Sequence, residues 1–241
     1  VLIIIFFYSV IIGAIQIIFK FDRKPYDIAI IIVGFILYFY GFFNRYNVRI
    51  TRYKLDFNQS TPIKIALITD LHIGDIGMNT KILTKAVNKI NEENVDIVII
   101  GGDIIEKKSS TFINDGYADI IKNIKTKYGV YAVLGNHEYY RESPYKLTEV
   151  SEKYGDVKVL NDSYVELENF YLIGREDPSK SYVSGKRKTL EEIIAPITNR
   201  EKLKIVADHN PANFYKSVNN KIDLQVSGHT HNGQFFPFNI I

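Results

Sequence analysis

The chain opens with two long apolar runs that contain no charged side chain. The first covers residues 1–19, the second covers residues 28–44, and a short polar segment with Pro25 connects them. As a helix rising about 1.5 Å per residue, the first run would span roughly 28 Å, close to the hydrocarbon thickness of a bilayer. The second run has 17 residues, the short end of the spanning range, and tyrosines near its ends suit a membrane interface. The pattern predicts a transmembrane helical hairpin over residues 1–44.

Two other interpretations of these runs stay open. A pair of buried core helices would have the same composition, and the first run could be a cleaved signal peptide. The second run behind it, and the lack of a small-residue cleavage pattern between the two, argue against a signal peptide. The orientation is not fixed, because three basic residues lie between the runs and four follow the second.

From residue 62 onward, short β-branched runs alternate with helical spacing. Within 80–91, for example, apolar residues recur on one helical face, with Asn79 or Thr80 as the cap. This alternation predicts an α/β layered domain over 62–241, joined to the apolar runs by a linker over 45–61. The predicted strands are 63–69, 95–100, 130–134, 157–160, 165–167, 171–173, 204–207 and 223–226, and the other predicted helices are 112–127, 144–154 and 189–195.

The amino-acid composition limits the partners and the metal ligands that the chain could have. Residues 44–241 carry 27 basic and 25 acidic side chains, so no nucleic-acid-binding surface is evident. The chain has no cysteine, which excludes disulfides and thiolate ligands, so nitrogen and oxygen donors would have to hold any metal. Because the chain begins at Val1 and stops soon after its last polar motif, we expect a fragment whose C-terminus is truncated.

Every one of the five histidines lies in a short motif of metal-ligand residue types. Each motif follows a predicted strand, and the carboxyl ends of strands in layered α/β proteins meet at one edge. Where the backbone stays extended, residues two apart point to one side, which would pair Asp70 with His72 and His229 with His231. Each motif alone is weak evidence, but together they predict a hydrolytic site with more than one metal ion. The motifs are Asp70-Leu71-His72, Gly101-Gly102-Asp103, Gly135-Asn136-His137-Glu138, Asp208-His209-Asn210-Pro211 and Gly228-His229-Thr230-His231.

In these five blocks the sequence resembles the calcineurin-like metallophosphoesterases, whose signature is D-x-H, G-D, G-N-H-[DE], H and G-H-x-H in that order. The match covers residues 62–236 and implies an αββα sandwich. The apolar runs and the forms of the first and last blocks are similar to the membrane-associated bacterial branch, although a glycine is common there at the position of Asn232.

The resemblance implies a centre of two divalent cations, with Mn, Fe, Zn or Co all compatible with the donors. Asp103 would bridge two ions that together acidify a shared water and clamp the phosphoryl oxygens. His137 would be a catalytic general acid, oriented by Asp70 or Glu138. The implied ligands of one ion are Asp70, His72 and His231, and those of the other are Asn136, His209 and His229.

The function these features predict is a multi-pass membrane protein, in a bacterial cell membrane, that hydrolyses phosphate mono- or diesters by metal-activated hydroxide attack. The anchor favours lipid-linked or cell-envelope substrates. The alternatives are a phosphodiesterase of soluble nucleotides and an inactive metal-binding scaffold, and the intact His137 argues against the scaffold. Arg175 and Asp177 either contact substrate or form a local ion pair, and Tyr139 and Tyr140 either line the pocket or pack.

Overall fold

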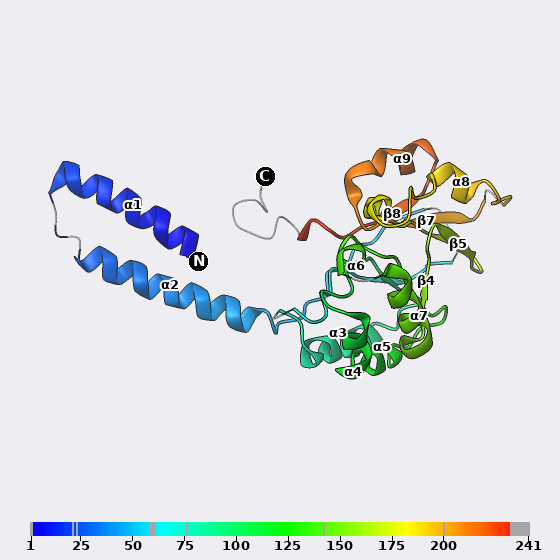
Figure 1. Ribbon diagram of the computed structural model, residues 1–241, viewed down its shortest axis with the longest axis horizontal. Coiled ribbons are helices and arrows are strands. Elements are labelled where there is room, and N and C mark those ends of the chain that lie inside the picture. The colour runs from blue at the N-terminus through cyan, green and yellow to red at the C-terminus, as the bar shows by residue number, and fades with distance from the viewer. Residues whose placement is uncertain are drawn as a thin grey trace. The chain divides into compact units, whose positions relative to one another are not determined.

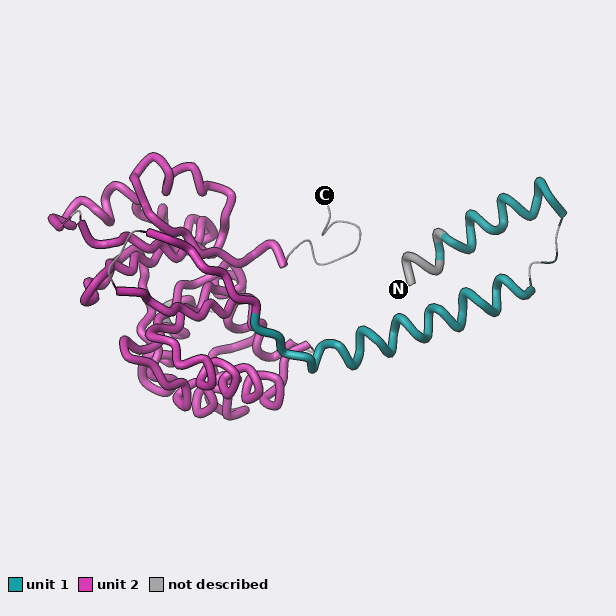
Figure 2. Tube along the Cα trace, turned by 180° about the vertical axis from the view of Figure 1, so that it is seen from behind, with its two compact units in different colours: residues 1–50 teal, residues 51–241 magenta. Residues whose placement is uncertain are grey.

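The computed structural model describes residues 2–20, 22, 24–57, 61–75, 77–141, 143–199 and 201–231. The chain divides into two compact units, Val1–Ile50 and Thr51–Ile241, coloured separately in Figure 2. All candidate site residues belong to the second unit.

The first unit consists of helices α1 (Leu2–Phe19) and α2 (Lys24–Asn44). Among the described residues, α2 is long and apolar enough to cross a membrane by length and composition, whereas the described apolar stretch of α1, Tyr8–Phe19, is shorter. Only Ile30 and Gly34 of α2 are buried, and its phenylalanines are largely exposed, unlike the side chains of a core helix. The structure thus provides one candidate for the two predicted spans, and the other span stays a prediction.

The second unit contains two four-stranded sheets. The strands of the first sheet are all parallel and lie side by side in chain order, whereas in the second sheet β5 is antiparallel to β6 and the remaining pairs are parallel. The first sheet contains β1 (Ile65–Ile68), β2 (Ile97–Ile100), β3 (Val130–Ala132) and β4 (Val157–Val159), and the second contains β5 (Ser163–Glu166), β6 (Phe170–Gly174), β7 (Leu203–Ala207) and β8 (Leu224–Val226).

Helices cover the outer face of each sheet, so the layers are helix, sheet, sheet, helix (Figure 1). Three short elements lie in the connecting segments: α6 (His137–Arg141), η1 (Pro178–Tyr182) and η2 (Pro211–Asn213). The helices on the first sheet are α3 (Thr80–Glu92), α4 (Ser109–Asn114), α5 (Tyr117–Lys122) and α7 (Pro144–Gly155), and those on the second are α8 (Leu190–Ile194) and α9 (Phe214–Asn219).

Strand β2 shows how the layers form from the sequence. Its four residues are all buried, and they alternate between two cores. Val98 and Ile100 pack with the helices, while Ile97 and Ile99 pack between the two sheets, as the two-residue period of a strand requires. The predicted αββα sandwich is therefore confirmed.

One predicted helix is wrong in its extent. The segment 112–127 was expected to form a single helix, but it is divided between α4 and α5. The break is at Gly116, whose φ of 79° lies in the left-handed region that a continuing helix cannot use. The predicted cap of α3 is confirmed at Asn79, whose side chain accepts a hydrogen bond from the backbone N–H of Ile82.

Candidate metal centre

The polar motifs meet at one edge of the sandwich, as predicted from the strand order. Asp70 follows β1, Asp103 follows β2, and Asn136 follows β3, all at the carboxyl ends of parallel strands. His209 and His229 follow β7 and β8 of the second sheet. The fold thus brings together residues that lie up to 161 positions apart in the chain, from Asp70 to His231.

The backbone at this edge is not extended, so the predicted reason for the pairing of Asp70 with His72 is wrong. Both residues have left-handed φ, 55° and 43°. Asp103, His229 and His231 share that conformation, with φ of 50°, 71° and 48°. A non-glycine residue held there costs about 1–3 kcal/mol, and such strain concentrates at functional sites. The turns, rather than strand alternation, direct these side chains toward one another.

A first group of four donors contains Asp70, His72, Asp103 and His231, whose ligand atoms all lie within 4.8 Å of one another. The Nε2 atoms of His72 and His231 are 3.3 Å apart, and His231 Nε2 lies 3.4 Å from Asp70 Oδ1. His72 Nε2 lies 3.8 Å from Asp103 Oδ2. Carboxylate oxygens and imidazole nitrogens this close together form a suitable shell for a divalent transition metal.

A second group contains Asp103, His209 and His229, with ligand atoms again within 4.8 Å of one another. Asn136 joins it, because its Oδ1 lies 2.9 Å from His229 Nδ1. Asp103 therefore belongs to both groups, which is the position that a bridging carboxylate would need. The two groups contain the same residues that the sequence predicted for two ions.

The buried ring of His209 tests whether a cation fits here. Its Nδ1 lies 2.8 Å from the carbonyl oxygen of Gly101 and donates to it, which leaves the lone pair on Nε2. That Nε2 is buried without a hydrogen-bond partner and lies 3.2 Å from Asp103 Oδ2. The lone pair of His209 Nε2 and the carboxylate oxygen of Asp103 are both acceptors, so their contact is stable only with a cation between them, either a proton or a metal ion. The donor set therefore fits a metal.

The protonation of His209 and that of Asp103 depend on each other. Burial alone lowers the pKa of His209, but the contact with Asp103 and the Gly101 carbonyl raise that pKa to about 9 overall. Burial raises the pKa of Asp103, but His209 and the backbone N–H of His137 together bring that pKa below its ordinary value. Asp103 is therefore ionised at neutral pH, as a metal ligand must be.

Glu106 is a site residue that the sequence motifs missed. Its Oε2 lies 2.7 Å from Nδ1 of His137 and 2.9 Å from Nδ1 of His72, and the two rings meet edge to face at 4.6 Å. The bridge between Ile73 and Ile105 places it there, since this bridge continues the parallel register of β1 and β2. The position of Glu106 beside these two histidines could be predicted only if the register of β1 and β2 were already known.

Glu106, rather than Asp70 or Glu138, therefore orients His137, and both predicted assignments need correction. The buried carboxylate of Glu138 accepts backbone N–H bonds from Gly135 and Asp103 on Oε2, at 2.7 and 3.0 Å. Its Oε1 accepts from Ile104 and Ile105, at 2.8 and 3.0 Å. Burial raises the pKa of Glu138 to about 7, although these N–H groups favour the ionised form. Glu138 fixes the backbone that carries Asp103.

The carboxylate of Asp70 likewise contacts groups other than His137. It accepts a hydrogen bond from the Thr69 hydroxyl at 2.8 Å and one from the backbone N–H of His229 at 3.0 Å. The second bond joins the first sequence block to the last. Asp70 therefore holds the two ends of the site together.

Two glycines permit the close approach of these loops. A Cβ atom on Gly135 would overlap Asp103, and one on Gly228 would overlap Thr69 and Asp70. Any larger residue at either position would displace a predicted ligand.

Four further residues were predicted either to contact the substrate or to have a structural role, and of these only Tyr140 is exposed, whereas Arg175, Asp177 and Tyr139 are buried. Arg175 is buried and bonds Asp208 at 2.9 Å, so it forms a local ion pair. The side chain of Asp177 caps η1 at the N–H of Ser179. Tyr139 is buried, whereas the exposed Tyr140 has its ring 5.7 Å from that of His137 and borders the site.

Comparisons with known proteins agree with this geometry. The family model described as calcineurin-like phosphoesterase matches residues 63–233. A protein of Helicobacter pylori, named an uncharacterized metallophosphoesterase, is 30% identical over 226 residues, which cover 87% of this chain and 57% of that protein. A metallophosphoesterase of Aquifex aeolicus, likewise uncharacterized, is 29% identical over 202 residues, covering 82% of this chain and 75% of that protein.

A Danio rerio protein named a transmembrane protein with metallophosphoesterase domain is 26% identical over 190 residues. The match covers 74% of this chain and 42% of that protein. The chain spans about half the length of the first curated relatives it matches, with 57% and 47% of theirs covered. In this chain, α2 has the length and apolar composition of a helix that could cross a membrane.

Proposed function

Because the chain belongs to the calcineurin-like phosphoesterase family, we propose that it is a membrane-anchored phosphoesterase that hydrolyses phosphate mono- or diesters at a centre of two divalent metal ions. The observation that carries this proposal is the membership of Asp103 in both groups of donors. Mn, Fe, Zn or Co would suit these oxygen and nitrogen donors. Asp70, His72 and His231 would hold one ion, and Asn136, His209 and His229 the other.

When bound, the cations supply Lewis acidity, which acidifies water and neutralises phosphoryl charge. The side chains of the site would position the substrate and transfer protons. The backbone N–H of His137 donates to Asp103 Oδ1 at 3.0 Å, which ties this residue to the centre of the site. Its Nδ1–H donates to Glu106, so Nε2 is left to face the substrate side, 3.9 Å from Asp103 Oδ2.

This arrangement suits His137 as the general acid. The carboxylate of Glu106 stabilises the imidazolium form, and the proton on Nε2 passes to the ester oxygen as its bond to phosphorus breaks. Glu106 would act through His137 and is thus a positioning residue. His72 shares the same carboxylate, so the orientation of a metal ligand and that of the acid depend on one group.

The anchoring part of the proposal is supported by α2 and by the exposure of its aromatic face. We extend it to a hairpin in which α1 also crosses the bilayer, in agreement with the uncharged sequence of residues 1–19. An enzyme held at a bilayer would have ready access to lipid-linked or cell-envelope phosphate esters. That substrate class follows from the anchor and not from the shape of the site.

The experiment that tests the function uses the full chain in detergent. Lipid phosphate esters, linear and cyclic nucleotides and a chromogenic phosphodiester are each incubated with Mn, Fe, Zn or Co, and product release is measured. Hydrolysis that depends on added metal and is lost in Asp103→Asn is expected. Asp119→Asn serves as control, because Asp119 is exposed in the first turn of α5. A preference for nucleotides would replace the lipid-linked class, and no hydrolysis with any metal would favour the inactive scaffold.

A further inference from the structure

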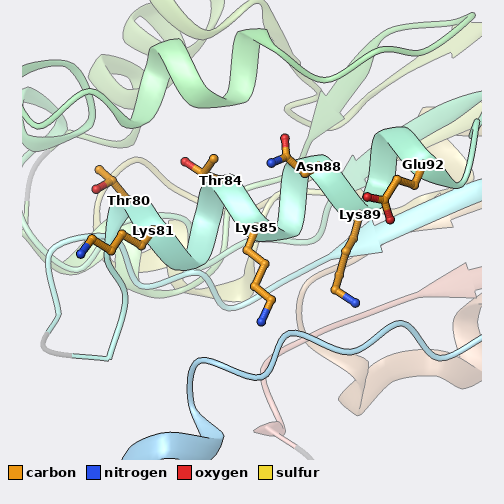
Figure 3. A pocket seen from close by; sticks show the side chains of 7 residues that line it. All are labelled: Thr80, Lys81, Thr84, Lys85, Asn88, Lys89 and Glu92. Atoms are coloured by element: carbon orange, nitrogen blue, oxygen red, sulfur yellow. The ribbon is translucent and has the colours of Figure 1, made fainter.

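The outer face of α3 carries a row of lysines. Lys81, Lys85 and Lys89 recur every fourth residue and therefore lie along one side of the helix (Figure 3). Together with Thr80, Thr84, Asn88 and Glu92 they line a shallow groove of about 630 Å³.

The direction of this lysine face is fixed by packing. The opposite side of α3 is buried in the core between the helices and the first sheet, so the helix cannot rotate its lysines inward without exposing that side. Glu92 is the one acidic residue among the seven that line the groove, which leaves the lysine face with an excess of positive charge. The buried residues of α3 are Ile82, Leu83, Val87 and Ile90.

The end of α3 also receives the chain that arrives from α2. Arg52 and Lys64 both form ion pairs with Glu93, the residue that follows the helix. The two positive charges are offset at this end by three carboxylates, those of Glu92, Glu93 and Asp96, the last of which accepts a hydrogen bond from the backbone N–H of Lys64 at 2.7 Å. The surplus of positive charge therefore lies along the lysine row, and the ion pairs hold the connecting chain at its end. Arg52 lies eight positions after Asn44, the end of α2, and a fully extended chain of eight steps reaches at most roughly 28 Å.

The direction of α3 relates this connection to the metal centre. The helix joins the carboxyl end of β1 to the amino end of β2, which are parallel neighbours. It therefore begins near the edge with the candidate ligands and ends near the edge where Arg52 and Lys64 lie. A flat surface against the lysine face would extend from the connecting chain to the border of the site.

We propose that the lysine face of α3 docks on the anionic headgroups of the bilayer that holds α2. Charge complementarity identifies the partner, and the short connecting chain keeps the domain within reach of it. The inference rests on the anchoring part of the proposed function and is independent of hydrolysis. Each lysine at an anionic surface multiplies the docked population roughly 5-fold, so three give a factor on the order of 100.

The test uses the full chain in vesicles of phosphatidylcholine, alone or mixed with phosphatidylglycerol. Because the chain has no cysteine, Thr84→Cys introduces a single thiol for a fluorophore on the lysine face. Energy transfer to acceptor-labelled headgroups reports docking. The matched probe is Asn219→Cys on α9, which covers the other sheet (Figure 1).

We expect stronger transfer from position 84 in the anionic vesicles, lost at about 1 M salt, where the Debye length is only about 3 Å. Replacing the three lysines with glutamine should lower the ratio of docked to undocked domain on the order of 100-fold. The control variant Lys186→Gln, Lys216→Gln, Lys221→Gln removes the same charge elsewhere and should keep the transfer.

Equal transfer from position 84 in neutral and anionic vesicles would overturn the docking proposal, as would transfer that survives loss of the three lysines. Stronger transfer from position 219 instead would assign docking to the opposite helical layer. Release of the full chain from vesicles by alkaline carbonate would overturn the anchoring and the docking together. Hydrolysis of a soluble ester in detergent is measured on the same variants, and its absence would count against the phosphoesterase alone.

Discussion

The Oε2 atom of Glu106 lies 2.7 Å from Nδ1 of His137. The same oxygen lies 2.9 Å from Nδ1 of His72, so one carboxylate fixes the tautomer of two rings with different predicted tasks. A histidine whose Nδ1–H is held in this way presents Nε2 outward. The orientation of the predicted general acid is therefore coupled to that of a predicted metal ligand.

Glu106→Gln should weaken this coupling without removing a predicted ligand. The amide retains one acceptor oxygen for two rings and carries no charge to stabilise an imidazolium. We expect kcat to fall about 10–100-fold, as is common for residues that orient a ligand or catalytic group. Steady-state kinetics on an alkyl phosphodiester measures it, with metal content determined in parallel.

Glu168→Gln is the matched control, since Glu168 is an exposed partner of Lys127 outside the site. Turnover of that variant should equal that of the unchanged chain. If Glu106→Gln were as active as this control, Glu106 would not orient His137 during the reaction.

Asp103→Asn tests the bridge. Because Asp103 Oδ2 lies near ligand atoms of both donor groups, the loss of its charge should weaken both ions together and abolish hydrolysis. Elemental analysis of the purified full chain measures the metals, with Asp119→Asn as the control. Two tightly bound metals in Asp103→Asn would contradict the bridging assignment.

Removal of metal should make stability depend on pH. Burial lowers the pKa of His209, but its contact with Asp103 raises the pKa from 6.5 to about 9 overall. The folded form then keeps this proton to a higher pH than the unfolded chain, so the stabilisation is complete below pH 6.5 and is lost as the pH approaches 9. The loss is on the order of 3 kcal/mol in the free energy of unfolding.

Urea denaturation of the chelated full chain at several pH values measures this loss. The metal-loaded protein is the control and should lose less, because the ion takes the place of the proton at Nε2. The same decline with and without metal would exclude the His209–Asp103 pair as its source.

The sequence predicts the convergence of the site because the strand order determines it. Each motif follows an apolar run, and parallel strands bring their carboxyl ends to one edge, so Asp70, Asp103 and His209 could be placed together without coordinates. The fold class follows from the same alternation of strand and helix signals.

What the sequence could not provide depends on backbone detail and register. The left-handed φ of Asp70 and His72 could not be predicted from the sequence, since neither position is a glycine and Asp and His, although enriched there, mostly adopt other conformations. Glu106 reaches His137 only through the pairing of Ile73 with Ile105, which is a contact between distant segments. Glu138 appears beside His137 in the motif, yet tertiary packing directs its carboxylate to backbone N–H groups.

Glu138→Gln should destabilise the domain. Four backbone N–H groups converge on the two oxygens of Glu138, and an amide would place its own NH₂ against two of those donors. Leaving buried donors unsatisfied costs about 1–3 kcal/mol each, so a loss of at least about 2 kcal/mol in the free energy of unfolding is expected. Chemical denaturation measures it, and the exposed Glu149→Gln is the control. Equal stability of the two variants would remove Glu138 as the support of the loop that carries Asp103.

His137→Ala separates an enzyme from a scaffold. The side chain of His137 contacts Glu106 and the predicted ligand His72, but it is not one of the predicted ligands, so the variant should keep its metal content. A lost general acid typically costs about 10²–10⁴-fold in kcat. The loss should be larger for alkyl esters, whose leaving oxygen needs a proton, than for nitrophenyl esters, which depart without one.

Kinetics on both ester types, beside Tyr140→Ala as a control for the exposed ring at the same border, therefore distinguish three outcomes. A loss that depends on the leaving group supports proton donation from Nε2. Equal losses on both esters would instead assign His137 to stabilising phosphoryl charge. Unchanged turnover on both would exclude His137 from the reaction, and the geometry around Glu106 would then have only a structural purpose.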